Sequence, residues 1–279
     1  MRYVSYAVAA GGARVGYLDG ESVWDAGFDG DMVDFIAAGA PLGQVRPAGR
    51  PRLLAPLRPR SLRDYLTFQG HMNNSLGRLG LAIPSEWFTV PGYYKGMPDT
   101  VIGPNAQIPW PYYTDKLDIE MELACVIGRP GKDITADQAM THVFGYTLWN
   151  DVSARDVQTR ELPLGLGPAK AKDWDGSNVL GPFIVTPDEF DASDAALELR
   201  VNGELWGGDT SRNMHHGFAQ LIAYASMAQT LHPGEVLGSG TFTGGSGVEQ
   251  DRWVQAGDSV EITLVGIGSL TNTIGRKGN

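Results

Sequence analysis

The chain has 279 residues, of which 42% are hydrophobic and 37 are glycine, and its formal net charge is −10. This apolar content excludes a fully disordered chain, the glycine and proline content excludes a coiled coil, and the acidic balance argues against duplex nucleic acid as a partner. The glycine excess favours strands and turns. The single cysteine, Cys125, lies in an apolar run and is expected to be a buried small hydrophobe.

The N-terminal part of the chain is expected to form a small α+β unit. Two strands, residues 3–9 and 13–18, flank the pair Gly11-Gly12, which is a hairpin signal. A short helix over 31–38 is expected to begin with Asp31 as its N-cap.

A proline-rich connector at 41–61 follows, and proline disfavours helix interiors and central strands. We therefore divide the chain into a small N-terminal domain, 1–58, and a catalytic domain, 59–279. No run of about 18 apolar residues occurs, so the sequence predicts a cytoplasmic protein without a membrane span.

The next segment shows a spacing typical of a helix. Asp64, Phe68, His71, Ser75 and Arg78 recur three and four residues apart, so they are expected to share one helix face.

Residues 83–115 contain six prolines and many aromatic residues, and are expected to be extended and loop-like. Loops this long in a compact chain are usually functional. Together with 61–82 this stretch is expected to close over the site as a lid, and a rigid surface wrap is the alternative.

The remainder of the chain is expected to form mostly β-strands. Strands are expected at 117–127, 144–149, 180–186, 197–201 and 260–265, with an Asn202-Gly203 hairpin turn and helices at 135–142 and 216–229. The predicted class is α+β, mostly β.

Two carboxylates on one strand are the first candidate for chemistry. Glu120 and Glu122 are two residues apart, so they point to the same face of a strand. Burial would raise both pKa values unless a cation neutralised them, which favours a hard divalent ion such as Mg²⁺, Ca²⁺ or Mn²⁺. The alternative is the solvent-exposed face of an amphipathic strand.

Further carboxylates extend this set. Asp151 ends an expected strand, and Asp64 precedes His71 on the same segment. Carboxylates without cysteine exclude a structural zinc site. The pair His215-His216 is expected at a helix N-terminus.

Other catalytic motifs are absent from the sequence. The glycine-rich run at 240–247, GTFTGGSG, lacks the P-loop lysine, and no dinucleotide-binding glycine motif opens a helix after a strand. There is also no G-x-S-x-G nucleophile elbow.

Several blocks in order resemble the fumarylacetoacetate hydrolase family. They are RDYLTFQGH (63–71), GYYKGMPDTVIGP (92–104), LDIEMELACVIG (117–128), WNDVSARDVQ (149–158), AKDWDGSNVLGP (171–182) and GTFTGG (240–245). The resemblance runs from about residue 50 to the C-terminus. It implies a mixed β-sandwich roll, a homodimer and an active-site Mg²⁺, with Ca²⁺ or Mn²⁺ as alternatives.

The resemblance also implies roles for individual residues. The metal ligands would be Asp64, Glu120, Glu122 and Asp151. The catalytic groups would be His71, which activates water, and Lys172 and Gln158, which stabilise oxyanion charge. Substrate-binding positions would be Arg155, Tyr94 and Thr241, with pairing of Arg155 to Asp156 or to a metal ligand as the alternative for that residue.

The chain departs from the family pattern around the histidine and the substrate pocket. The glutamate-bearing segment that pairs with the histidine is missing, and Glu249 is only a weak substitute for it. The position where shorter relatives have a glutamate is Asn74, and two substrate tyrosine positions are Leu66 and Leu162.

The implied function is hydrolytic cleavage of a C–C bond in a 1,3-dicarbonyl acid, an acylpyruvate or a fumarylacetoacetate-like compound. The alternatives are a decarboxylase, isomerase or hydratase of 2-oxo or 2-hydroxydienoic acids, and a non-hydrolytic biosynthetic tailoring enzyme.

Overall fold

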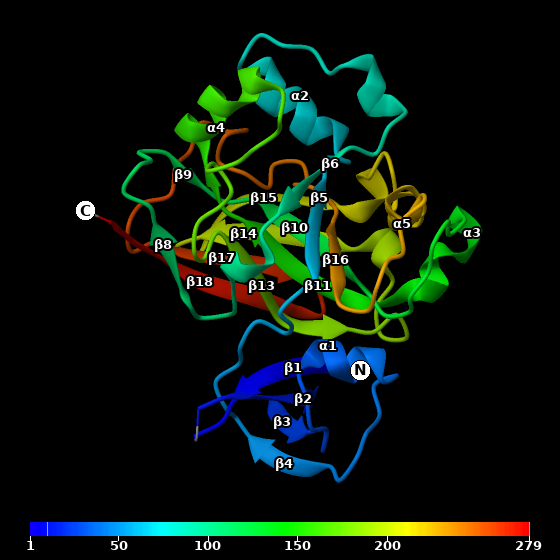
Figure 1. Ribbon diagram of the computed structural model, residues 1–279. Coiled ribbons are helices and arrows are strands. Elements are labelled where there is room, and N and C mark those ends of the chain that lie inside the picture. The colour runs from blue at the N-terminus through cyan, green and yellow to red at the C-terminus, as the bar shows by residue number, and fades with distance from the viewer. Residues whose placement is uncertain (10, 279) are drawn as a thin grey trace.

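The structure is a computed structural model that describes residues 1–9 and 11–278. Strands dominate, and short helices cover them (Figure 1). The α-helices are α1 (Met32–Ala37), α2 (Gln69–Gly77), α3 (Ala136–Ala139), α4 (Arg155–Glu161) and α5 (Phe218–Ser226). The 3₁₀ helices are η1 (Ser85–Phe88), η2 (Pro98–Thr100), η3 (Met140–His142), η4 (Leu162–Leu164), η5 (Ala192–Asp194) and η6 (Ser211–Asn213).

An 11-stranded mixed sheet forms the centre of the molecule. Its strands, in spatial order, are β4 (Arg46–Gly49), β3 (Ser22–Asp25), β2 (Ala13–Asp19), β1 (Arg2–Ala7), β13 (Asn178–Val185), β11 (Val143–Asp151), β10 (Met121–Ile127), β16 (Glu235–Gly238), β5 (Ser61–Tyr65) and β6 (Tyr93–Gly96). Strand β7 (Val101–Ile102) pairs with β13 off this path.

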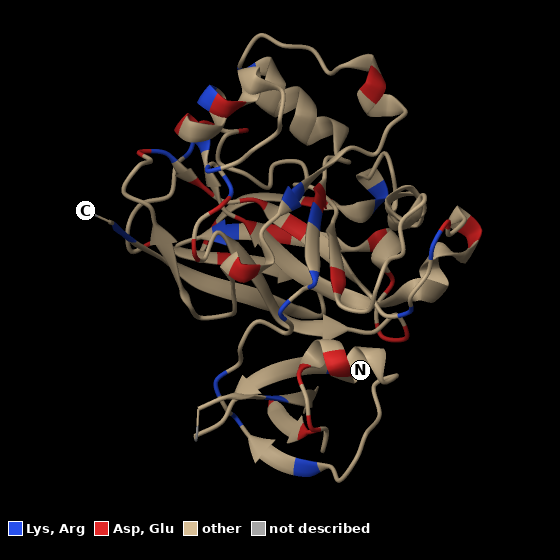
Figure 2. Cartoon of the chain, in the orientation of Figure 1, with Lys and Arg blue, Asp and Glu red and all other residues tan. Residues whose placement is uncertain are grey.

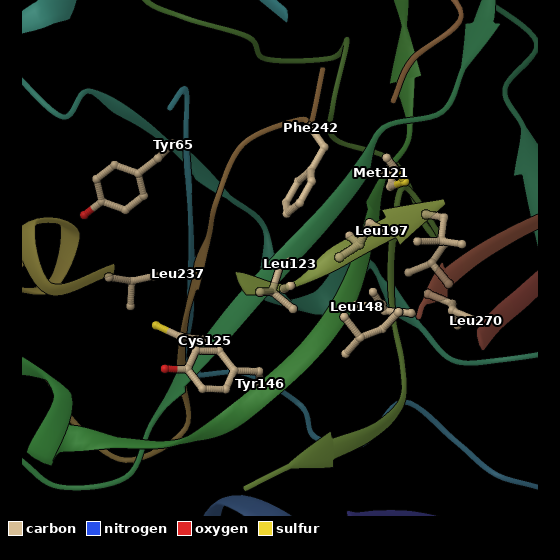
Figure 3. Close-up of a cluster of buried hydrophobic side chains, with 14 of the residues drawn as sticks. Tyr65, Met121, Leu123, Cys125, Tyr146, Leu148, Leu197, Leu237, Phe242 and Leu270 are labelled. Atoms are coloured by element: carbon tan, nitrogen blue, oxygen red, sulfur yellow. The ribbon is translucent and has the colours of Figure 1, made fainter. Parts of the chain in front are cut away.

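A five-stranded sheet packs against the first. Its order is β15 (Glu204–Thr210), β14 (Ala196–Val201), β17 (Ser259–Leu264), β18 (Gly268–Lys277) and β8 (Gln107–Trp110). A small pair joins β9 (Leu117–Asp118) to β12 (Ser153–Ala154). Leu123 and Leu148 of the first sheet share one hydrophobic cluster with Leu197 and Leu270 of the second (Figure 3). Full burial of each such side chain contributes roughly 1.5–3 kcal/mol.

Strand β10 is buried along its whole length because both of its faces are covered. Leu123 and Cys125 face the cluster shared with the second sheet. Ala124 and Val126 belong to a second cluster, which includes side chains of the N-terminal unit. The burial of Cys125 confirms its expected role as a small hydrophobe.

The N-terminal unit is a β-meander with one short helix, and it lies below the main body in Figure 1. The expected hairpin forms, with β1 and β2 antiparallel, and Asp31 caps α1 through the backbone N–H of Asp34. Strand β1 also pairs with β13, so the unit extends the main sheet. The division of the chain at 58/59 stays a prediction.

Several local predictions hold in the C-terminal part. The hairpin between β14 and β15 turns at Asn202 and Gly203, which both have positive φ as this turn requires. Helix α5 buries Phe218, Leu221 and Ile222 on one face. No helix in the described part of the chain is long and apolar enough to cross a membrane.

One expectation near the site is wrong, and a second is incomplete. The shared helix face beginning at Asp64 does not form, because Asp64 lies in strand β5 and helix α2 starts only at Gln69. Parallel pairing of β5 with β16 provides backbone partners that local spacing does not reveal. The stretch 83–115 is more than a loop, since it contributes β6 and β7 to one sheet and β8 to the other.

Candidate active site

Four carboxylates converge where neighbouring strands of the large sheet end. Asp64 comes from β5 and Asp151 from the end of β11. Glu122 lies in β10, and Glu120 directly precedes that strand. Each offers an oxygen within 4.8 Å of the others, and all four residues are buried. We call these residues the acidic cluster. Their burial rules out the solvent-exposed strand face as an interpretation of the glutamate pair.

Strand β16 makes room for this cluster because Gly238 has no side chain. A Cβ at Gly238 would lie 2.7 Å from Asp64 Oδ1 and 2.8 Å from Glu122 Oε2, distances that real Cβ contacts do not show. Gly238 pairs with Asp64 of the neighbouring strand β5 and with Ala124 of β10 on its other side. The glycine therefore lets carboxylates from two strands approach across a third.

Two buried cations contact one side of the acidic cluster. Lys172 Nζ donates to Glu120 Oε2 at 2.5 Å and to Asp151 Oδ2. Arg155, at the start of α4, donates through Nη2 to Glu120 Oε1 at 2.5 Å and through Nε to Asp118 Oδ2 at 2.7 Å. In Figure 2 basic and acidic segments mix in the middle of the molecule, beneath α2 and α4.

The carboxylates differ in their electrostatic surroundings. Burial, and next the charge of Asp151, raises the pKa of Asp64 well above its usual range. Burial, and next the charge of Asp64, does the same to the pKa of Glu122. Burial also opposes ionisation of Glu120, but Arg155 and Lys172 outweigh it and lower the pKa of Glu120. The Asp64–Glu122 side is therefore short of positive charge.

Three buried carboxylate oxygens of the acidic cluster, two of them on this side, are left without a partner in the described part of the chain. Asp64 Oδ1, Glu122 Oε2 and Asp151 Oδ1 have no hydrogen-bond partner among the described residues. Buried polar atoms normally have partners, and carboxylate oxygens without sulfur or imidazole ligands suit hard divalent cations. The acidic cluster fits a divalent metal ion, which Asp64, Glu120, Glu122 and Asp151 would hold.

Metal binding is expected to release protons and to weaken as pH falls. The raised pKa values of Asp64 and Glu122 mean that the metal-free cluster holds protons at a pH where ordinary carboxyls are ionised, and a cation requires the ionised forms. Titration calorimetry with Mn²⁺ in buffers of different ionisation enthalpy would count the released protons. Binding that releases no protons between about pH 5 and pH 7 would contradict this charge distribution.

His71 has a carboxylate partner that sequence reasoning rated as weak. His71 Nδ1 donates to Glu249 Oε1 at 2.8 Å, and both residues are buried. Asn74 and the backbone N–H of Gly244 donate to the other oxygen of Glu249, at 2.9 and 2.8 Å. The interpretation of Glu249 as only a weak substitute is therefore wrong.

Helix α2 approaches the glycine-rich run closely enough to make this contact. A Cβ at Gly70 would lie 2.4 Å from Thr243 Cγ2, so the residue before His71 needs to be small. With Nδ1 bonded to Glu249, the other ring nitrogen, Nε2, is the one available to a ligand in the cavity that His71 lines.

Asp118 is a further organising residue that sequence reasoning missed. It accepts hydrogen bonds from the backbone N–H groups of Gly247 and Val248, at 2.8 and 3.0 Å, and from Arg155 Nε. It therefore connects the loop that holds Glu249 to the arginine that holds Glu120. Its place two residues before Glu120, on the same strand run, was the one available signal.

The remaining expected site residues divide between cavity and interior. Tyr94 lines the cavity and donates to Asp151 Oδ2 at 2.8 Å. Gln158 also lines the cavity, and its side-chain oxygen accepts from Arg155 Nη1 at 2.9 Å. Thr241 lies within the interior, with its hydroxyl 3.5 Å from Glu122 Oε1. The alternative of an Arg155–Asp156 pair does not form, since Asp156 accepts from Thr114 and nearby backbone groups.

These groups open into one large cavity of about 1100 Å³. The acidic cluster contributes Asp64 and Glu120 to its lining, and His71 and Lys172 line it as well. The imidazole of His71 and a candidate metal site therefore face the same space, and such a combination of groups in one cavity marks a candidate active site.

Comparison with known proteins identifies the family of this chain. The model of the fumarylacetoacetate (FAA) hydrolase C-terminal domain matches residues 62–275. The chain therefore belongs to the fumarylacetoacetate hydrolase family.

Solved structures of similar proteins cover nearly the whole chain. A fumarylacetoacetate hydrolase from Exiguobacterium antarcticum is 28% identical, with a TM-score of 0.83 and 99% of each chain covered. A 5-carboxymethyl-2-hydroxymuconate delta-isomerase from Mycobacterium smegmatis is 31% identical, with a TM-score of 0.79 and 100% of each chain covered. These matches confirm the expected fold class.

Curated relatives match over a shorter span. Oxaloacetate tautomerase YisK of Bacillus subtilis is 37% identical over 164 residues, which are 58% of this chain and 53% of that protein. Protein Rv2993c of Mycobacterium tuberculosis is 39% identical over 64% of each chain. The matched part thus spans about half to two thirds of these relatives.

Proposed function

We propose that the protein hydrolyses a C–C bond in a 1,3-dicarbonyl acid of the acylpyruvate type, with a divalent cation, Mg²⁺ first, in the acidic cluster. One observation supports this most strongly: the His71–Glu249 pair and the cluster line or adjoin the same cavity. When bound, a divalent cation supplies Lewis acidity, which polarises carbonyl groups and stabilises negative charge on oxygen.

The chain's own residues supply the proton chemistry. His71 Nε2 takes a proton from water, and the Glu249 carboxylate stabilises the imidazolium that results. The water oxygen forms a bond to the acyl carbonyl carbon, and the bond from that carbon to the central carbon then breaks. The electron pair of the broken bond stays with the central carbon, so the 2-oxo acid leaves as its enolate. Protonation of that central carbon then gives one carboxylic acid and one 2-oxo acid.

Other cavity residues hold the substrate and its developing charge. Lys172 and Gln158 line the cavity, and we assign them to stabilising oxyanion charge. Tyr94 is placed to contact substrate beside Asp151. Arg155, bonded to Asp118, Glu120 and Gln158, acts mainly by orienting these groups.

A second candidate is isomerisation or tautomerisation of a 2-oxo acid. It is favoured by the names of two similar proteins, an oxaloacetate tautomerase and a 5-carboxymethyl-2-hydroxymuconate delta-isomerase. Such a reaction uses the same carbonyl polarisation and a proton-transferring group, but needs no attack by water and breaks no C–C bond.

A product assay separates the two candidates. Acetylpyruvate and longer acylpyruvates, and separately oxaloacetate, are incubated with the protein and Mg²⁺ or with EDTA. The loss of enol absorbance is followed while NMR identifies the products. We expect equal amounts of carboxylic acid and pyruvate from the acylpyruvates, only with Mg²⁺. Faster keto–enol exchange without any cleavage would support the second candidate and overturn the first.

A further inference from the structure

The cavity extends well beyond the candidate metal site, and its outer wall is mostly apolar. The side chains that form this apolar wall are Leu66, Met72, Leu76, Leu79, Trp87, Val90, Leu162, Val248 and Trp253. Leu66, Leu79 and Leu162 are each about half exposed, at 45%, 51% and 48%. Large apolar side chains gathered around a cavity and left in contact with water typically mark a surface that a ligand covers.

Helix α2 sets the direction of this wall relative to His71. Met72 and Leu76 are four residues apart, so they lie on one side of the helix, next to the side that presents His71 and Ser75. With a rise of 1.5 Å per residue, Leu76 lies about 7.5 Å further along the helix axis than His71. An apolar strip therefore begins beside the proposed base and leads away from it.

The cations that line the cavity are already engaged. Arg78 donates through Nε and Nη2 to the carbonyl oxygen of Glu249, at 3.1 and 3.0 Å. Lys116 Nζ lies over the ring of Trp253, 4.9 Å from its centroid. Lys172 and Arg155 are held by the carboxylates described above.

Acidic groups also face the outer space. Glu86, Asp156 and Asp251 line it together with Arg78 and Lys116. Acidic groups thus outnumber basic ones in the outer lining, which disfavours a second carboxylate on the substrate.

We propose that the acyl part of the substrate is an extended apolar chain or ring, which lies along Met72, Leu76 and Leu162, while its 2-oxo acid end lies at the acidic cluster. This inference rests on the proposed function for the placement of the 2-oxo acid. It names the substrate class as acylpyruvates with an apolar tail, and it excludes a dicarboxylic compound as the preferred substrate.

Non-cleavable probes test the tail without requiring turnover. N-alkyl oxamates have a carboxylate next to a carbonyl, as a 2-oxo acid does, and their alkyl chain can be lengthened one methylene at a time. Titration calorimetry on the Mg²⁺-loaded protein would compare ethyl, butyl and hexyl oxamates with a chain of the same length that ends in a carboxylate. Burying each methylene is expected to tighten binding about three- to fourfold.

Variants then locate the tail. Leu162→Ser should remove most of the gain with chain length while leaving the affinity for ethyl oxamate nearly unchanged. The matched control is Leu166→Ser, since Leu166 is 89% exposed in the segment after η4 and does not line the cavity. This control should bind all probes as the parent protein does.

The outcomes separate this inference from the proposed function. The apolar-tail inference would be overturned if the oxamates bound with the same affinity at every chain length. It would also be overturned if a carboxylate-ended chain bound more tightly than its alkyl counterpart. Either result would leave the 2-oxo acid site standing. If no oxamate binds the Mg²⁺-loaded protein, the proposed placement of the 2-oxo acid fails, and the inference fails with it.

Discussion

Replacing His71 by alanine is expected to lower kcat about 10²- to 10⁴-fold while divalent-metal binding remains intact. In the proposed mechanism the imidazole takes a proton from water through Nε2, since Nδ1 is bonded to Glu249 and His71 lines the cavity. The four carboxylates do not depend on His71 for their positions, because Asp64, Glu122 and Asp151 lie in strands β5, β10 and β11 and Glu120 directly precedes β10. Single-turnover kinetics together with Mn²⁺ titration would measure both quantities.

Two further variants make this result specific. His142→Ala serves as the matched control, because the His142 ring contacts the carbonyl oxygen of Arg129 at 3.0 Å and does not line the cavity. Glu249→Gln should reduce kcat less than His71→Ala does, since the amide oxygen can still accept from Nδ1 but no longer offers a charge to the imidazolium. Full turnover in His71→Ala would refute the assignment of the base.

The second large effect is expected at the acidic cluster, where Asp64→Asn should abolish Mg²⁺-dependent stabilisation. Magnesium at 100 times its Kd should stabilise the parent protein by about 2.7 kcal/mol, and the amide offers one neutral oxygen in place of a carboxylate. Without metal, the variant should be as stable as the parent or more so, because it removes repulsion with Asp151 and Glu122. Thermal unfolding with Mg²⁺ and with EDTA measures both effects.

Asp151→Asn is the informative partner of this variant. It should lose metal stabilisation too, but it also removes a carboxylate from buried Lys172. Breaking a buried ion pair costs about 3–5 kcal/mol, so the metal-free Asp151→Asn protein should be clearly less stable than Asp64→Asn. Equal metal-free stabilities would contradict the division of the cluster into a cation-paired side and an unpaired side.

Local patterns predicted the parts of the molecule that depend on neighbouring residues. The spacing of Glu120 and Glu122 placed both on one face of a strand, and the Asn202-Gly203 pair specified a tight hairpin. In both cases the geometry is set within a few residues by backbone periodicity and allowed φ values.

Local patterns could not predict contacts between residues that lie far apart in the sequence. Glu249 follows His71 by 178 residues, and the fold of the glycine-rich run decides that the two meet. Asp64 matched a helical spacing, yet pairing of β5 with β16 outweighed that local preference. The resemblance to family motifs supplied the four carboxylates as one set, but not the hydrogen bonds of Asp118 that connect them to Glu249.

The size of the cavity likewise depends on tertiary packing. Helices α2 and α4 both lie above the sheets in Figure 1. Leu76 of α2 and Leu162 of η4, which directly follows α4, lie far apart in the sequence but line the same cavity. Their sequence neighbourhoods hold no periodic signal for a shared pocket.

Anomalous scattering from a crystal grown with Mn²⁺ would show directly whether the acidic cluster holds a metal ion. We expect one strong peak per chain among Asp64, Glu120, Glu122 and Asp151, beside the cavity that His71 lines. Saturating Mn²⁺ that gives no peak there, or a peak only at other carboxylates, would contradict the metal centre on which the proposed chemistry depends.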